Sequence, residues 1–192
     1  MAEFQLLNRA NVDAQHFKLL PYTSKVKGLL EKIEDSFQGK FHFLQQMCIQ
    51  YVLQHLEERC QFLNFGIGNG KSLLCTTLAI ILKKISTNNV IILNTSEYLT
   101  YRDYHKFKDC IDSCELRCSL NLPEARSITY MDEKNFKLLW KRKKEPFDPS
   151  KTILILDEYD QLLFEQSTSK LMLASLNNVN SYSRLIGITG TT

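Results

Sequence analysis

Gly66-Ile67-Gly68-Asn69-Gly70-Lys71-Ser72 stands between two apolar stretches, residues 62–65 and 73–82. The stretch predicts a phosphate-binding loop between a strand and a helix, because glycines let backbone N–H groups approach an anion and the helix adds the positive end of its dipole. The ammonium of the lysine can reach the β- and γ-phosphates of a nucleotide, and the serine hydroxyl can bind Mg²⁺. We expect the cofactor to be held by Gly66, Gly68, Asn69, Gly70, Lys71, Ser72 and Leu73.

The loop departs from the G-x-x-x-x-G-K-[ST] pattern at one position. Phe65 occupies the place of the first glycine. The Gly-x-Gly-Lys-Ser core and its apolar flanks keep the chemistry that phosphate binding needs.

Around this loop, strand-like and helix-like segments alternate along the chain. Buried-strand patterns cover residues 61–65, 90–93, 127–130, 153–156 and 185–188, and helical patterns cover 44–58, 71–86, a segment that starts at Glu97 with Ser96 as its N-cap, and 132–141. Such alternation predicts parallel strands joined by helical crossovers. We therefore expect an α/β domain with a mostly parallel sheet of about five strands.

The first 40 residues differ from the rest. They contain one amphipathic segment, Ser24 to Phe37, which ends at Gly39, and no chemistry that we can name. We expect an N-terminal helical arm or cap over residues 1–40 and one nucleotide-binding lobe over 41–192. With 192 residues, of which 44% are hydrophobic, the chain can close one substantial core but not two full domains.

Composition gives little information about partners. A net charge of +3 is too small to indicate a nucleic-acid binder by itself. No apolar run is long enough to span a bilayer, and the N-terminus lacks a secretory pattern, so we expect a cytoplasmic protein.

The basic run Lys141 to Lys144 is followed by Pro146 and Pro149, which predicts a solvated surface loop, with contact to a phosphate backbone or an acidic partner as the alternative.

The six cysteines lie mostly in apolar contexts, which favours reduced thiols over a disulfide framework. Cys110, Cys114 and Cys118 recur at every fourth residue, which would align them on one helical face near His105. A soft-metal cluster is one interpretation of this spacing. The ordinary core period of a helix is the interpretation that we favour, because the C-x-x-C pattern is absent.

An acidic cluster, Asp157-Glu158-Tyr159-Asp160, directly follows the strand-like run 153–156. Open α/β sheets bind ligands at the carboxyl ends of their strands, and this arrangement is typical of a Walker B motif. We predict that Asp157 holds Mg²⁺ through its water shell and that Glu158 orients and deprotonates the attacking water. The alternative is an acidic N-cap for the next helix, but the phosphate loop upstream favours the functional interpretation.

Two further segments carry polar groups that suit a nucleotide. Residues 187–192 are small and hydroxylated and follow the last strand pattern, which suits either a contact with the γ-phosphate or a plain turn. Upstream, Gln45, Gln46 and Gln50 lie in the helix before the first strand. One amide can pair with both the N6 and N7 edges of adenine, although glutamines on a helix are often only exposed polar positions.

In their order, these motifs resemble the nucleotide-binding lobe of the DEAD-type motor of SecA, the preprotein translocase ATPase, over about residues 41–192. His42-Phe43-Leu44-Gln45-Gln46 resembles the glutamine motif that recognises adenine in that family, and residues 65–72 are similar to M-x-T-G-E-G-K-T, which also lacks the first glycine. Residues 94–103 resemble V-N-D-Y-L-A-x-R-D, the most discriminating similarity. Residues 157–160 match D-E-V-D, and 187–191 match G-M-T-G-T.

The resemblance implies a three-layer, RecA-like P-loop lobe that binds ATP or ADP with Mg²⁺. It implies Gln46 and Thr189 as further nucleotide contacts, Lys71 and Glu158 as the catalytic pair, and Ser72 with Asp157 as the magnesium ligands. Asn69 replaces the glutamate of the family's loop, which removes a charge near the phosphates.

Two departures from the SecA pattern concern whole segments. Only a short stretch, expected to be helical around 170–178, joins Asp160 to Gly187, so the preprotein-crosslinking insertion is missing. The sequence also stops after the last motif, without a second RecA-like lobe and its arginines, and we expect such a lobe alone to hydrolyse slowly or not at all.

We therefore expect an ATP-binding lobe that hydrolyses Mg-ATP only with a second lobe, in order to move a polypeptide or a nucleic acid. The main alternative is a non-catalytic scaffold or interaction subunit of a larger assembly, built on a truncated motor lobe. A helicase lobe is a third possibility, with the basic run 141–144 as its only local support. A protein partner or larger assembly is expected in the first two cases, and none of the three requires a membrane-spanning segment.

Overall fold

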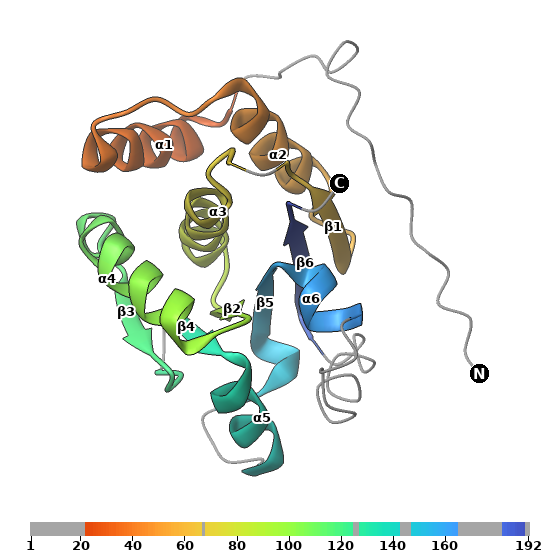
Figure 1. Cartoon of the computed structure of the whole chain (residues 1–192). Coiled ribbons are helices and arrows are strands. Elements are labelled where there is room, and N and C mark those ends of the chain that lie inside the picture. The colour runs from red at the N-terminus through yellow and green to blue at the C-terminus, as the bar shows by residue number, and fades with distance from the viewer. Residues whose placement is uncertain (1–21, 67, 125–126, 143–146, 165–181, 191–192) are drawn as a thin grey trace.

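A computed structural model describes residues 22–66, 68–124, 127–142, 147–164 and 182–190 of the chain (Figure 1). The helices are α1 (Ser24–Phe37), α2 (Phe43–Gln54), α3 (Lys71–Ile85), α4 (Glu97–Ser113), α5 (Glu133–Arg142) and α6 (Tyr159–Phe164), with a 3-10 turn at Pro149–Lys151. The strands are β1 (Cys60–Asn64), β2 (Asn89–Asn94), β3 (Arg117–Leu120), β4 (Ser127–Asp132), β5 (Thr152–Asp157) and β6 (Arg184–Thr189).

The strands form one sheet in the order β1-β6-β5-β2-β4-β3, and every neighbouring pair is parallel. The five strands expected from the sequence are confirmed, and β3 is a sixth that the sequence analysis missed. Arg117–Leu120 has only four residues, lies at the edge of the sheet, and begins only four residues after the last residue of α4. A run this short has too little periodicity to be separated from the end of a helix.

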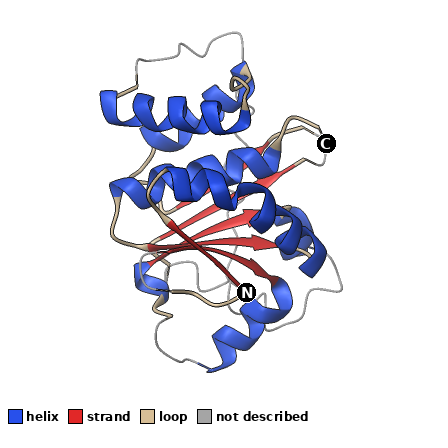
Figure 2. Ribbon diagram, turned by 90° about the vertical axis from the view of Figure 1, so that its left-hand side faces the viewer, coloured by secondary structure: helices blue, strands red, loops and turns tan. Residues whose placement is uncertain are grey.

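Side chains that alternate along each strand pack into two separate cores. Val90 and Ile92 of β2 face the core that contains α1 to α4, whereas Ile91 and Leu93 face the core that contains α5 and α6. Figure 2 shows the resulting three layers, with helices on both sides of the sheet. Burial on both faces explains why the central strands have nearly continuous apolar runs. The expected three-layer α/β fold is confirmed.

Helix α1 matches the amphipathic segment expected from the sequence. Thr23 caps its start by accepting a hydrogen bond from the backbone N–H of Val26 (3.4 Å). Gln38 ends it in the left-handed conformation (φ 51°), and the N–H of Gly39 donates to the carbonyl of Glu34 (3.1 Å). The residue at the helix C-cap is therefore the glutamine, not the glycine on which the sequence prediction rested.

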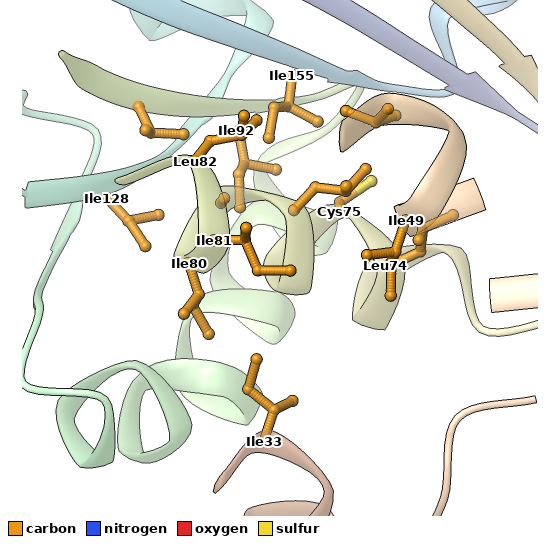
Figure 3. Packing of buried hydrophobic residues seen from close by; sticks show 14 of the residues in the cluster. Ile33, Ile49, Leu74, Cys75, Ile80, Ile81, Leu82, Ile92, Ile128 and Ile155 are labelled. Carbon is orange, nitrogen blue, oxygen red and sulfur yellow. The ribbon is translucent and has the colours of Figure 1, made fainter. Parts of the chain in front are cut away.

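The apolar face of α1 belongs to the same core as the sheet. Its buried residues are Val26, Leu29, Leu30 and Ile33, and the ring of Phe37 packs edge-on against Phe107 of α4, with centroids 5.3 Å apart. In Figure 3, Ile33 points from α1 toward α3. The helix therefore contributes directly to the packing of α3 and α4.

The cysteines do not form the aligned row that the sequence allowed. Helix α4 ends at Ser113, so Cys114 is its C-cap and Cys118 lies in β3. The three thiols do not share a helical face, because the chain turns into a strand between the second and the third. In the described ranges, no group of three or more histidine, cysteine, aspartate or glutamate side chains is placed to hold a metal ion. All six cysteines are free thiols, as expected.

Other boundaries moved by a few residues. Helix α5 extends to Arg142, so the basic run begins on a helix, and its continuation at 143–146 lies outside the described residues, as does the helix expected around 170–178. None of the helices in the described ranges has both the length and the apolar character that crossing a lipid bilayer requires.

We predict that Ile33→Ala lowers the free energy of unfolding by about 2–5 kcal/mol, because it leaves a cavity in a fully buried site. Urea denaturation followed by circular dichroism measures the change, and Lys27→Ala on the exposed face of α1 is the matched control. A loss below about 1 kcal/mol would mean that α1 is a detachable arm and not a part of the core.

Candidate functional site

Polar residues gather where four parallel strands end. β1, β6, β5 and β2 are neighbours in the sheet and end at Asn64, Thr189, Asp157 and Asn94. The glycine loop leaves β1 at this edge and leads into α3. This is the edge at which open α/β sheets bind their ligands.

Backbone conformation explains the glycines of the loop. Gly68 and Gly70 have φ values of 82° and 80°, in the left-handed region that other residues rarely adopt. Gly70 is the N-cap of α3, so the free N–H groups of the first turn point out of the helix at this position. A Cβ atom on Gly70 would lie 2.7 Å from Nε2 of Gln45, so a side chain here would have to displace that carboxamide. Ile67 lies outside the described residues.

Phe65, the departure from the usual loop pattern, is buried in the core next to β6. Its backbone N–H donates to the carbonyl of Thr189 (2.7 Å). The aromatic side chain thus packs into the core, while the backbone of the same residue joins the start of the loop to the last strand.

A glutamine braces the loop from α2, but it is not the one that the sequence singled out. Nε2 of Gln45 donates to the carbonyl of Asn69 (3.1 Å), while its Oε1 accepts from the backbone N–H of His42 (2.9 Å). Gln46 instead donates through Nε2 to the carbonyl of Phe41 (3.0 Å). The position of Gln45, three residues after the N-cap His42 of α2, was the available signal, because a capping-box glutamine turns back toward the helix start. Contact between Gln46 and a base stays a prediction.

The two residues predicted to be catalytic are in direct contact. Nζ of Lys71 forms an ion pair with Oε1 of Glu158, and both side chains are largely shielded from water. The ammonium also lies close to the backbone at Gly190, where an added Cβ would be 2.6 Å from Nζ. Each member of this pair therefore neutralises the charge of the other.

Asp157 is buried beside this pair. Its Oδ1 has no hydrogen-bond partner in the part of the chain that the structure describes. The pKa of its carboxyl is raised from 3.8 to about 6, chiefly by burial; the charge of Lys71 opposes the shift, those of Glu158 and Asp103 add to it, and that of Arg102 opposes it. A buried anionic oxygen without a partner fits a site for a divalent cation, since Mg²⁺ prefers oxygen ligands.

Ser72, the other predicted magnesium ligand, contacts a residue of α4. Its Oγ accepts a hydrogen bond from Nη2 of Arg102 (3.3 Å). The guanidinium is held in turn by the buried carboxylate of Asp103, through Nε at 2.8 Å and Nη2 at 2.7 Å. Sequence analysis placed Arg102 and Asp103 in a motif but gave them no role, because only the fold brings Arg102 of α4 to the first turn of α3.

The remaining predicted contacts lie around the loop. Oγ1 of Thr189 donates to Oδ1 of Asp160 (2.5 Å), which ties the end of β6 to the start of α6. Leu73 packs partly buried against the core. The structure thus brings together Lys71, Ser72, Asp157, Glu158 and Thr189, whereas the roles of these residues toward a nucleotide or metal stay predictions.

A family model for the SecA DEAD-like domain matches residues 6–189 of the chain. The chain belongs to this family. The match includes most of the first 40 residues, upstream of the stretch in which we noted a resemblance. Among curated proteins, none matches the chain.

Solved structures with a similar fold include proteins that bind RNA or are named helicases. One is Dbp5 of S. cerevisiae bound to RNA and ADP BeF3, with a TM-score of 0.69, 16% identity, and coverage of 85% of this chain and 44% of that chain. Another is the UvsW helicase from bacteriophage T4, with a TM-score of 0.55, 16% identity, and coverage of 79% and 53%. The matched part of this chain thus spans about half the length of these proteins, and the similarity supports a RecA-like fold.

We predict that Asp157→Asn stabilises the metal-free lobe at high pH and not at low pH. The carboxyl ionises near 3.8 in the unfolded chain and at about 6 in the folded lobe, so the folded state binds the proton more tightly. Stability of the wild type therefore falls as the pH rises from about 4 to above 6, by on the order of 2–3 kcal/mol, and asparagine removes that loss.

Urea unfolding in EDTA at about pH 4, 6 and 8 measures the difference in the free energy of unfolding between the variant and wild type. Asp148→Asn serves as the control, because a hydrogen bond from Ser150 lowers the pKa of that exposed carboxyl and gives it the opposite pH dependence. If the difference in the free energy of unfolding between Asp157→Asn and wild type is the same at every pH, the prediction is contradicted.

Proposed function

We propose that this SecA-type lobe binds Mg-ATP at the glycine loop and hydrolyses it only when a second lobe completes the site, so as to move a polypeptide or a nucleic acid. The observation that carries this proposal is the contact between Lys71 and Glu158, at the edge of the sheet where the loop, Ser72 and Asp157 also meet. Membership of the SecA DEAD-like family supports it.

The ion pair between Lys71 and Glu158 suggests how binding and hydrolysis are linked. The phosphates of a nucleotide would compete with Glu158 for the ammonium of Lys71, because both are anions and the loop N–H groups favour the phosphate. When Lys71 turns to the phosphates, the carboxylate of Glu158 is free to accept a proton from water. The base is thus available only when the lobe holds nucleotide.

Ser72 and Asp157 would hold Mg²⁺. The side chains present fit the ion, since one is a hydroxyl in the first turn after the loop and the other is a buried carboxylate with an unpartnered oxygen. When bound, the ion would neutralise part of the charge on the phosphate oxygens.

The nucleotide base is proposed to be adenine, recognised by Gln46. The carboxamide of Gln46 keeps an oxygen for the N6 amino group while its Nε2 is engaged by Phe41. ADP BeF3 bound to Dbp5, part of which has the same fold, supports an adenine nucleotide here.

A lobe of this kind needs a partner for turnover. Arginines supplied from outside the phosphate site raise phosphoryl-transfer rates by several orders of magnitude. The transported substrate, polypeptide or nucleic acid, would then pass between two lobes that ATP closes and hydrolysis opens.

We predict that Lys71→Ala weakens Mg-ATP binding by about tenfold to a hundredfold, because it removes a charge-assisted contact to phosphate. Glu158→Gln is expected to bind Mg-ATP at least as tightly as wild type, since its neutral amide no longer competes for the ammonium. Isothermal titration calorimetry measures both affinities, and Lys106→Ala, an exposed cation on α4, is the matched control.

A phosphate-release assay on the same proteins separates an enzyme from a scaffold. If wild type releases phosphate and neither Lys71→Ala nor Glu158→Gln does, the lobe hydrolyses ATP by itself. Tight binding without release would leave catalysis to a two-lobe assembly or favour a structural role for the nucleotide. Equal affinities of Lys71→Ala and wild type would contradict the proposed site.

A further inference from the structure

Asn94, the last residue of β2, is a buried polar residue whose role is not explained by the fold. Only 1% of its surface is exposed, and neither Oδ1 nor Nδ2 has a hydrogen-bond partner within the described ranges. Leaving a buried carboxamide unpaired costs folding free energy, and nearly all buried polar groups in proteins are paired with protein or ordered water. A residue that carries such a cost is expected to bind something that the protein itself does not supply.

The register of the sheet places Asn94 next to Asp157. Leu93 pairs with Leu156 in the parallel ladder between β2 and β5, so the next residues along the two strands are neighbours. Because side chains alternate between the two faces of a strand, Asn94 lies on the same face of β2 as Val90 and Ile92, which pack toward α3.

Asp157 lies on the same side of the sheet. It shares a face with Ile153 and Ile155 of β5, and Figure 3 shows Ile92 and Ile155 together on the side of the sheet that α3 covers. Asn94 and Asp157 therefore lie side by side beneath the first turn of α3, and each has a buried oxygen without a partner among the described residues.

The chemistry of the surroundings selects the ligand. Among the described residues, Asp157 is the carboxylate without a paired cation in this region, because Asp103 is paired with Arg102, and Ser72 adds a hydroxyl. A carboxamide offers one acceptor and two donor hydrogens, so it can accept from a water and donate to a carboxylate at the same time. Mg²⁺ keeps several of its waters when proteins bind it, and those waters are strong donors.

We propose that Asn94 is a positioning residue for the metal, whose carboxamide holds a water of the Mg²⁺ hydration shell next to Asp157. The proposal rests on the proposed function, because it assumes that a Mg-nucleotide binds at Ser72 and Asp157. The motif resemblance implied no role for Asn94, so the proposal adds a residue to that site.

Replacement of Asn94 by leucine, which has the same branching, tests the proposal through two readouts of opposite sign. The free energy of unfolding of the metal-free lobe should stay equal or rise, because an unpaired buried polar group is replaced by an apolar one. The Mg²⁺ concentration that gives half-maximal binding of a fluorescent ADP analogue should rise by about tenfold or more, the usual effect of removing a group that orients metal ligands.

Thr77→Val is the matched control. The hydroxyl of Thr77 in α3 is also buried and has no partner among the described residues, but it lies more than a helical turn beyond Ser72. This substitution should also leave stability equal or raise it, while the Mg²⁺ requirement stays that of wild type. Asn94→Ala provides a second variant that fits the site without any need to accommodate a larger side chain.

A raised Mg²⁺ requirement in both Asn94 variants, with stability retained in Asn94→Leu, supports the proposal. An unchanged Mg²⁺ requirement in either folded variant overturns it and leaves the carboxamide with an ordinary buried water. If wild type binds no ADP analogue at any Mg²⁺ concentration, the proposed function fails and this proposal fails with it. If wild type binds the analogue in the presence of Mg²⁺, the comparison of the variants with wild type tests the role of Asn94 alone.

Discussion

Burial of the two central strands on both faces determines where this protein can place its polar groups. Every residue of β5 is buried, and so is every residue of β2 after its first. Strands in this situation satisfy their backbone groups within the ladder and accept few polar side chains along their length. Polar groups can therefore concentrate only where the strands end, and at this edge Asn94 and Asp157 end their strands next to each other.

Electrostatics at that edge is balanced except at one position. The charges of Lys71 and Glu158 offset each other, and those of Arg102 and Asp103 do the same. Asp157 has no such partner, which is why burial raises its pKa and disfavours its charged form. A cation next to this carboxylate would remove that penalty, so the same burial that destabilises the metal-free lobe would strengthen the attraction of the site for a metal.

The sequence predicted the parts of the fold whose signals are local. Three closely spaced glycines before Lys71 indicate the loop, because left-handed backbone and close approach to an anion both require glycine. The long apolar runs indicated five strands. Residue pairs such as Arg102 with Ser72, or Gln45 with Asn69, were not predictable, since they join segments about 25–30 residues apart and depend on how the helices pack. Strand β3 was missed because four residues carry too little pattern.

The backbone of Glu158 connects the fold to the chemistry. Its φ of 58° places a residue other than glycine in the left-handed region, at a cost of about 1–2 kcal/mol. Such a conformation persists only where the surroundings fix it, and strained residues of this kind concentrate at functional sites. Here the N–H groups of Gln161 and Leu162 both donate to the carbonyl of Glu158, which starts α6.

The side chain of the same residue meets the ammonium of Lys71. A relaxed, extended Glu158 would continue β5 and lose this geometry, because successive residues of a strand point to opposite faces and its carboxylate would then leave the face that Asp157 occupies. The left-handed turn is therefore what allows the carboxylates of two consecutive acidic residues to lie at the same edge of the sheet.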